Sequence, residues 1–291
     1  MADGRVVKIN GKIYPKTLKA FAKVNLHLQV CGLKGNYHEI VTLFQTVSLS
    51  DELYIEPSLS PGVKFYSEPK LLWNEENTLY KACESFERLT HQRLSIRITL
   101  KKCIPFSGGL GGGSSDAGTL LRALGVLLKI PFRTIYKAAC KVGSDVPFFL
   151  VGGTAIGLGR GERLIFPGDL EGYKVDLYFP GLGVSTPEAF AMIDKENHNE
   201  EQDISKAFEL YRALKDGDFS KVASLSSNTF ERVILRLEKI AKLYEEISRK
   251  KAIFHRLSGS GSTLFSLYEP ESRDGNYNFV SSAEVKKLND F

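Results

Sequence analysis

Alternating apolar and polar residues predict several β-strands in the first part of the chain. From 20 to 30 the even positions are all apolar, and this period of two is typical of a half-buried strand. The other face carries Lys23 and Asn25, about 7 Å apart by strand geometry, so both could reach one ligand or could simply face water. Further strands are expected at 41–47, 52–56, 94–100 and 174–179.

Apolar residues at steps of three and four predict helices in both halves of the chain. They are expected at 76–89, 114–128, 132–142 and 207–214. The clearest stripe runs from Phe230 to Ile247 and predicts one long helix, with Asn228 and Glu231 as a capping pair at its start. The polar stretch after Glu269 is expected to be a loosely held end.

A linker is expected at 164–170, where Pro167 and Gly168 interrupt the pattern. The chain has 291 residues, enough for two domains that each bury a core. We therefore predict an N-terminal domain at 1–167 and a C-terminal domain at 168–291.

The most informative stretch is PFSGGLGGGSSDAGTLL at 105–121, where five glycines run directly into a helical pattern. Ser114 or Ser115 is placed to cap the first turn. Glycines let a backbone approach an anion and a helix N-terminus carries partial positive charge, so we interpret the stretch as a phosphate-binding loop. The alternative is a loop that merely turns the chain.

Two better-known phosphate motifs do not fit this loop. A Walker A loop requires lysine after its last glycine, and here Gly113 is followed by serine. A dinucleotide fingerprint counted from Gly109 and Gly111 would need glycine or alanine at position 114, which is also serine.

Two other loops are candidates for function. Asp145 lies between a glycine stop and Pro147, where it could act in catalysis or cap the following turn. The segment LSGSGSTLF at 257–265 places two glycines among hydroxyls before an apolar strand, so it could be a plain turn or could close over phosphates. The glycine-dense run at 152–162 is more typical of strand connections than of a second phosphate site.

Composition narrows the class of protein. Hydrophobic content of 43% and charged content of 25% are typical of a soluble globular protein. The net charge of +5 suits an anionic small substrate and falls short of the basic stripe of a nucleic-acid binder. The four cysteines show no paired spacing for zinc or a disulfide framework. The first residues lack a signal-peptide core, and the uncharged run at 146–159 is too short to span a bilayer, so we expect a cytoplasmic protein without a membrane partner.

The order of these motifs resembles the GHMP kinases, the superfamily of galactokinase, homoserine kinase and mevalonate kinase. The resemblance rests on Lys23-x-Asn25, the glycine-rich loop, GSDVPF at 143–148 and LSGSGSTLF, and it covers nearly the whole chain. FAKVNLHLQV, Tyr37-His38-Glu39, TLFQ at 42–45, FLVGGTA at 149–155 and STPEAF at 185–190 resemble members that act on a cytidine diphosphate conjugate of methylerythritol. The implied fold is α+β, with an N-terminal domain like ribosomal protein S5 domain 2 and a ferredoxin-like C-terminal domain.

The resemblance implies transfer of the ATP γ-phosphate to the 2-hydroxyl of the methylerythritol moiety, in the methylerythritol phosphate pathway of isoprenoid precursor biosynthesis. Asp145 would be the base, with Lys23 beside it. Mg²⁺ is expected with ATP, and either Ser115 or the phosphates alone could hold it. The implied ATP contacts are Asn77, Gly108, Gly109, Leu110, Gly111, Gly112, Gly113, Ser114, Ser115, Gly259, Ser260 and Gly261. The implied substrate contacts are Asn25, Tyr37, His38, Thr186, Pro187 and Phe190.

Two rival functions remain open. Another small-alcohol kinase of the superfamily would keep the glycine loop and Asp145 but would have no use for Tyr37, His38 and Phe190. A non-catalytic RNA-binding or regulatory module would not need the pair of Lys23 and Asp145, and its binding would fall steeply with salt. The favoured reading is a small-molecule kinase that is a monomer or a weak homodimer.

Overall fold

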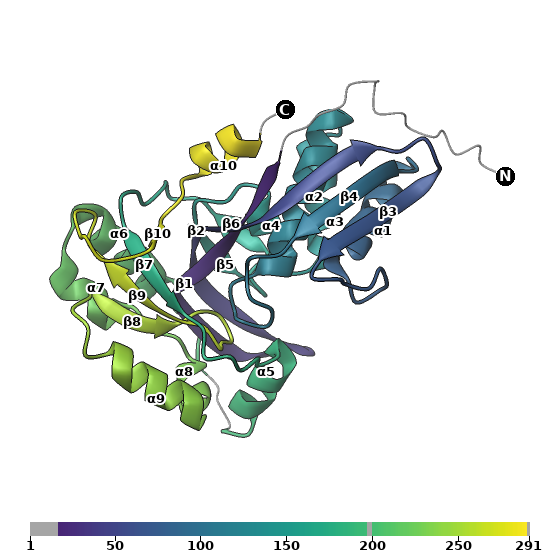
Figure 1. Ribbon diagram of the computed structural model, residues 1–291. Coiled ribbons are helices and arrows are strands. Elements are labelled where there is room, and N and C mark those ends of the chain that lie inside the picture. Colours follow the sequence, from purple (N-terminus) through teal and green to yellow (C-terminus); the bar gives the residue numbers. More distant parts are fainter. Residues whose placement is uncertain (1–16, 197–199, 290–291) are drawn as a thin grey trace.

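Two long antiparallel strands, β1 (Leu18–Lys34) and β2 (Tyr37–Pro57), run through the middle of the molecule (Figure 1). The computed structural model describes residues 17–196 and 200–289. The three strands predicted between 20 and 56 lie in this hairpin, and β2 continues unbroken through the gap expected at 48–51. Lys23 and His27 are only 3% and 1% exposed, so the polar face of β1 is covered by other parts of the chain.

The N-terminal part is one mixed sheet with helices packed on one face. The sheet order is β3-β4-β2-β5-β6, with β1 paired to β2. Its further strands are β3 (Gly62–Glu68), β4 (Ser95–Lys101), β5 (Thr154–Leu158) and β6 (Arg163–Ile165). Its helices are α1 (Thr78–Thr90), α2 (Gly112–Leu127), α3 (Phe132–Val142) and α4 (Val146–Phe149). Apolar residues of α1, α2 and α3 pack with those of β4 in one core.

The C-terminal part is an antiparallel sheet of order β10-β7-β9-β8 with helices beside it. The strands are β7 (Lys174–Tyr178), β8 (Phe254–Leu257), β9 (Leu264–Tyr268) and β10 (Tyr277–Asn278). The helices are α5 (Thr186–Asp194), α6 (Ile204–Asp216), α7 (Phe219–Leu225), α8 (Glu231–Ile234) and α9 (Glu238–Ile247). Val41 and Leu43 of β2 share a core with Val175, Leu210 and Phe265, so the central hairpin packs against both parts.

The long helix predicted at 230–247 is wrong, because the chain forms two shorter helices there. Leu237 has extended backbone angles, φ −73° and ψ 118°, which separate α8 from α9. The predicted capping pair forms only in part. Asn228 Oδ1 accepts from the Phe230 N–H at 3.0 Å just before α8, but Glu231 accepts from the Leu257 N–H instead of completing the pair. The Asn228 amide also donates to the carbonyls of Leu257 and Gly259. Both side chains therefore hold the loop that follows β8.

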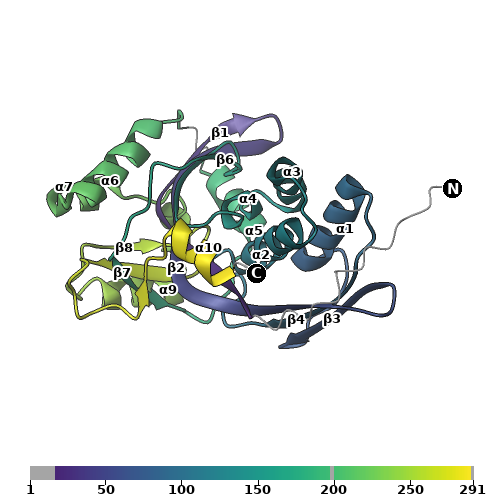
Figure 2. The same cartoon turned by 90° about the horizontal axis from the view of Figure 1, so that it is seen from above.

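The expectation of a loosely held C-terminal end is also wrong for the described residues. The helix α10 (Ser282–Asn289) lies over the central strands (Figure 2). Val285 packs against Phe21 of β1, and the Asn289 side chain bonds both backbone groups of Lys19. The buried residues of α10 are Val285 and Asn289, one turn apart. Two positions are too few to give a recognisable helical pattern in the sequence.

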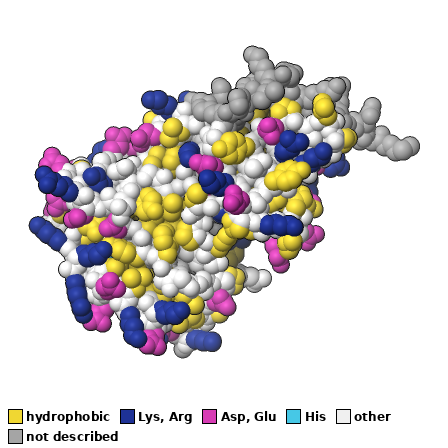
Figure 3. Space-filling view, in the orientation of Figure 1, with side chains coloured by type: hydrophobic (Ala, Val, Ile, Leu, Met, Phe, Trp, Pro, Cys, Tyr) yellow, Lys and Arg dark blue, Asp and Glu magenta, His cyan; other side chains and the backbone are white. Residues whose placement is uncertain are grey.

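The observed mixture of sheets and helices confirms the α+β fold class. The division at 167/168 stays a prediction. Over the face seen in Figure 3, lysines and arginines are interspersed with acidic side chains, in keeping with the mild net charge. Among residues 17–196 and 200–289, none of the helices is long and apolar enough to cross a membrane.

Candidate active site

The glycine-rich loop leads into α2 through a left-handed residue. Gly111 is the N-cap of α2, with φ 71° and ψ 20°, and no side chain caps the helix. The expected serine cap is therefore wrong. The Ser115 hydroxyl donates to the Phe21 carbonyl at 2.6 Å and is buried, whereas Ser114 lines the cavity described below. The helix end thus presents backbone N–H groups and one serine hydroxyl to a ligand.

The glycine loop is packed directly against the loop at 258–263. The Ser258 hydroxyl and the Thr263 N–H donate to the carbonyls of Gly109 and Gly108 at 3.0 and 3.2 Å. A Cβ on Gly109 would lie 1.9 Å from the Ser258 carbonyl oxygen, so only glycine fits at this crossing. The two glycine-bearing segments of the sequence therefore form one continuous wall.

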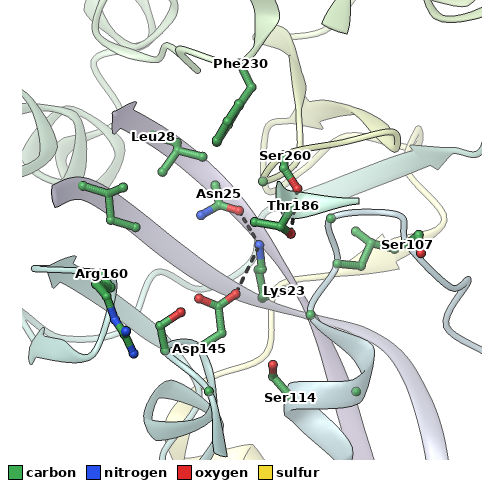
Figure 4. Close-up of a pocket in the computed structure, with 18 of the residues that line it drawn as sticks. Lys23, Asn25, Leu28, Ser107, Ser114, Asp145, Arg160, Thr186, Phe230 and Ser260 are labelled. Carbon is green, nitrogen blue, oxygen red and sulfur yellow. Dashed lines mark hydrogen bonds and ion pairs between the residues drawn. The ribbon is translucent and has the colours of Figure 1, made fainter. Parts of the chain in front are cut away.

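Lys23 is buried at the centre of the site, between Asn25 and Asp145 (Figure 4). Its ammonium donates to Asn25 Oδ1 at 2.5 Å and lies 3.9 Å from Asp145 Oδ2. Burial lowers the pKa of Lys23, and the attraction of Asp145 opposes that shift. Asn25 is fixed in turn by a bond from its amide to Thr42 at 2.7 Å, so the β1 face orients the lysine.

Asp145 has the N-cap position of α4, yet its side chain makes no capping bond. Its carboxylate instead faces Lys23 and lines the cavity, with 29% of the side chain exposed. The capping alternative is thus wrong for this side chain. A partly exposed carboxylate beside a buried cation can accept a proton from a bound hydroxyl.

These groups open onto one cavity of about 720 Å³, a size that accommodates a small-molecule ligand. Sixteen of the predicted site residues lie on its wall: Lys23, Asn25, Tyr37, His38, Gly108, Gly109, Leu110, Gly111, Gly112, Gly113, Ser114, Asp145, Thr186, Phe190, Gly259 and Ser260. The structure does not bring Asn77, Ser115, Pro187 and Gly261 to this wall. The Gly261 N–H donates to the Ser258 carbonyl and shapes the loop from behind.

A second cavity of about 350 Å³ shares Thr78, Lys102 and Phe106 with the first. Asn77 lines this one and caps α1, because its Oδ1 accepts from the Leu79 N–H at 2.9 Å. The Thr78 hydroxyl donates to the Gly113 carbonyl at 2.7 Å. The start of α1 is thereby attached to the glycine loop where the two cavities meet.

A buried charge cluster forms the floor between the two cavities. The Lys102 ammonium bonds the carboxylates of Asp51 and Asp116, and all three side chains are nearly inaccessible. Burial would lower the pKa of Lys102, but the attraction of Asp116 and Asp51 outweighs it and raises that pKa. Burial also raises the pKa of Asp116, against the attraction of Lys102.

Aromatic rings gather at the opposite end of the main cavity. The His38 and Phe190 rings are stacked, with centroids 5.3 Å apart and planes 10° apart. Phe190 also meets the edge of Phe230 at 5.0 Å. Tyr37 is 41% exposed, and the Arg160 guanidinium lies 5.6 Å from its ring centroid. This end therefore offers ring faces and one cation to a ligand.

Sequence reasoning missed several of these wall residues. Lys102, Arg160 and Asp194 carry charges at the cavities, but none stands in a recognisable spacing. Asp116 directly follows Ser115 in the glycine-rich motif, and this position was the signal that could have marked it as a residue near the site. Its pairing with Lys102 depends on tertiary structure alone.

The fold and the site together define the chain as a kinase of the GHMP class. The family model described as GHMP kinases N terminal domain matches residues 77–153, and GHMP kinases C terminal matches residues 210–283. A crystal structure of L. major mevalonate kinase in complex with R-mevalonate has a TM-score of 0.61 at 15% identity, and the match covers 99% of this chain and 93% of that one. That likeness supports the fold alone.

More similar relatives narrow the class to one family. The proteins named 4-diphosphocytidyl-2-C-methyl-D-erythritol kinase from Thermotoga petrophila and Thermotoga maritima are 41% and 42% identical, over 90% of this chain and 95% of their own. A crystal structure of 4-(cytidine 5'-diphospho)-2C-methyl-D-erythritol kinase has a TM-score of 0.72 at 33% identity, covering 87% of this chain and 90% of that one. The chain belongs to this kinase family.

Proposed function

We propose that the protein transfers the γ-phosphate of ATP to the 2-hydroxyl of 4-diphosphocytidyl-2-C-methyl-D-erythritol. The observation that carries the proposal is the placement of Lys23 and Asp145 beside the glycine loop, in a cavity that ends in an aromatic pocket. The names of the relatives support the same substrate. The product is an intermediate of isoprenoid precursor biosynthesis.

Asp145 would orient the substrate hydroxyl and accept its proton. Phosphoryl transfer requires mainly positioning and stabilisation of spreading negative charge. Lys23 supplies a buried positive charge next to the carboxylate, which would stabilise charge on the transferring group. The bond from Lys23 to Asn25 limits the movement of that charge.

The glycine loop and the start of α2 would hold the ATP phosphates. Residues 108–114 line the cavity, and the N-terminus of a helix favours an anion. The adjoining cavity, lined by Asn77, Thr78 and Phe106, would take the nucleoside end of ATP because it opens off the glycine loop. The Lys102 ammonium lies under both cavities, but its charge is already paired with Asp51 and Asp116, so it adds no net positive charge to this nucleotide side.

Mg²⁺ would arrive with the ATP phosphates. Among the described residues no group of three or more His, Cys, Asp and Glu side chains could hold a metal ion. Mg²⁺ bound to phosphates needs only one or two protein ligands, so this donor set still fits. Ser114 is the side chain at the helix start that could contribute, since the Ser115 hydroxyl is already bonded. The ion supplies neutralisation of phosphate charge.

Tyr37, Phe190 and Arg160 would bind the cytidine diphosphate end of the substrate. Ring faces suit a stacked base, and the Arg160 guanidinium beside Tyr37 suits a phosphate. This aromatic pocket favours the cytidine substrate over the smaller alcohols of other GHMP kinases. The cytoplasmic location and a monomer or weak homodimer stay predictions.

The test is ADP formation from Mg-ATP with a panel of alcohols that includes the cytidine diphosphate conjugate and free methylerythritol. We expect turnover of the conjugate and little of the free alcohol. Asp145→Asn should lower kcat about 10² to 10⁴-fold with little change in KM for ATP. Equal use of free methylerythritol would refute the pocket, and normal turnover by folded Asp145→Asn would remove it from catalysis.

A further inference from the structure

Asp194, the last residue of α5, brings a carboxylate to the aromatic end of the cavity. It lines the wall together with Tyr37, His38 and Phe190. Its Oδ1 lies 2.7 Å from His38 Nε2, while 51% of the side chain is exposed. Within residues 17–196 and 200–289, Oδ2 makes no hydrogen bond. One oxygen of this carboxylate is therefore open to a ligand.

The His38 side chain, in contrast, has both ring nitrogens engaged. Nδ1 is 2.8 Å from the Cys31 carbonyl and Nε2 faces Asp194. The ring is buried and stacked on Phe190. The resemblance implied that His38 contacts the substrate. In this arrangement Nε2 contacts Asp194 and Nδ1 contacts the Cys31 carbonyl, so the ring nitrogens have little to offer a base.

Asp194 is the acidic acceptor at this end with an open oxygen. The acidic side chains on the wall formed by the described residues are Asp145 and Asp194, and Asp145 faces Lys23. The Asn25 side chain is engaged by Lys23 and Thr42, and Arg160 can only donate. A base in the aromatic pocket would therefore meet a carboxylate oxygen at its edge.

We propose that Asp194 is a specificity residue that accepts a hydrogen bond from the 4-amino group of the substrate's cytosine ring. This inference rests on the proposed function. Cytosine carries a donor at position 4, whereas uracil carries an acceptor there, and an ionised carboxylate only accepts. The same oxygen that binds cytosine therefore repels uracil. The hydrogen bond between His38 Nε2 and Oδ1 holds the carboxyl group in place for this selection.

The experiment measures kcat/KM by ADP release with three substrates that differ only in the base: cytosine, uracil and 2-pyrimidinone, which lacks the 4-amino group. The enzymes are the wild type, Asp194→Asn, Asp194→Ala and the control Glu196→Gln. Glu196 is an acidic residue two positions on, paired with Arg236 at 2.5 Å and absent from the cavity wall.

We expect the wild type and Glu196→Gln to use the 2-pyrimidinone form about 10 to 100 times less well than the cytosine form, the range for a hydrogen bond to a charged group. Asp194→Ala should lose a similar factor on the cytosine form and show little further loss with 2-pyrimidinone. Asp194→Asn should discriminate less between cytosine and uracil, because its amide can accept or donate. KM for ATP should not change.

The ratio between the cytosine and 2-pyrimidinone forms separates recognition from a structural effect. If Asp194 only supported His38 and Phe190, its loss would lower kcat/KM for both forms and leave their ratio as in the wild type, which would overturn the proposal. If the wild type turned over none of the three substrates, the proposed function itself would fail. The two failures are therefore distinct.

Discussion

The buried imidazole of His27 should make the stability of the protein depend on pH. His27 is 1% exposed in β1, its Nδ1 lies 3.2 Å from the Ser227 hydroxyl, and its Nε2 has no partner among the described residues. Burial lowers the pKa of His27 to about 4 from 6.5. The Leu225 backbone and Asp203 oppose this lowering of the pKa, whereas Lys206 and Arg256 add to it.

The direction of the effect follows from the two pKa values. As pH falls below 6.5, His27 binds a proton in the unfolded chain, whereas in the folded protein it stays neutral until about pH 4. The free energy of unfolding therefore falls as pH decreases across this window. At 1.36 kcal/mol per pH unit the upper bound is about 3 kcal/mol. Water penetration screens part of the burial cost, so we expect a loss of roughly 1 to 3 kcal/mol.

The assay is urea unfolding of the wild type and His27→Gln at several pH values between 4 and 7. The glutamine side chain of His27→Gln does not titrate, so this variant should lose less stability than the wild type as pH falls, whatever its stability at pH 7. His91→Asn is the control, because His91 is exposed and its left-handed φ of 54° suits asparagine. Parallel pH curves for the wild type and His27→Gln would refute the reasoning.

Three further predictions test the walls of the site. Asp51→Asn should destabilise the protein by about 2 to 4 kcal/mol, because Asp51 accepts hydrogen bonds from two backbone N–H groups as well as from Lys102. Asp116→Asn should destabilise it little, and the reverse order in chemical denaturation would contradict this. Gly111→Val should lower Tm as well as ATP affinity, since a Cβ would lie 2.8 Å from a ring carbon, while Gly181→Val, in open space, should lower Tm less. Tyr37→Ala should raise KM for the cytidine substrate about tenfold and spare ATP in steady-state assays.

The sequence pattern predicted correctly those helices and strands whose apolar residues form one clear buried face. The helix predicted at 132–142 is confirmed, since α3 has the same bounds. Its apolar stripe ends at Val142, and Gly143 follows as the C-cap. The alternation at 94–100 likewise matches β4 within a residue. The strand β3 went unpredicted because it lies at the sheet edge, where Val63 and Phe65 pack on the core but are only partly buried. Periodicity is informative where one face is buried, and edge strands lack that signal.

The sequence predicted those parts of the site that are formed by recognisable motifs. The glycine loop and the Lys23 and Asp145 pair follow from residues that stand in recognisable order, and they meet in one cavity. Lys102 could not be found in this way, because its two carboxylate partners come from different elements, β2 and α2. Asp194 is similar, since its relation to His38 spans 156 positions of the chain.

The contacts between the two glycine-bearing loops explain why the site needs both parts of the molecule. Gly109 belongs to the N-terminal part, and its carbonyl accepts from Ser258 of the C-terminal part. The Lys23 N–H donates to the Leu110 carbonyl at 3.0 Å, which ties the same loop to β1. Separation of the two parts would therefore remove the packing that shapes the phosphate loop and move Lys23 relative to it. A ligand that fills the cavity contacts all of these segments at once, so its binding should stabilise the assembled molecule rather than either part alone.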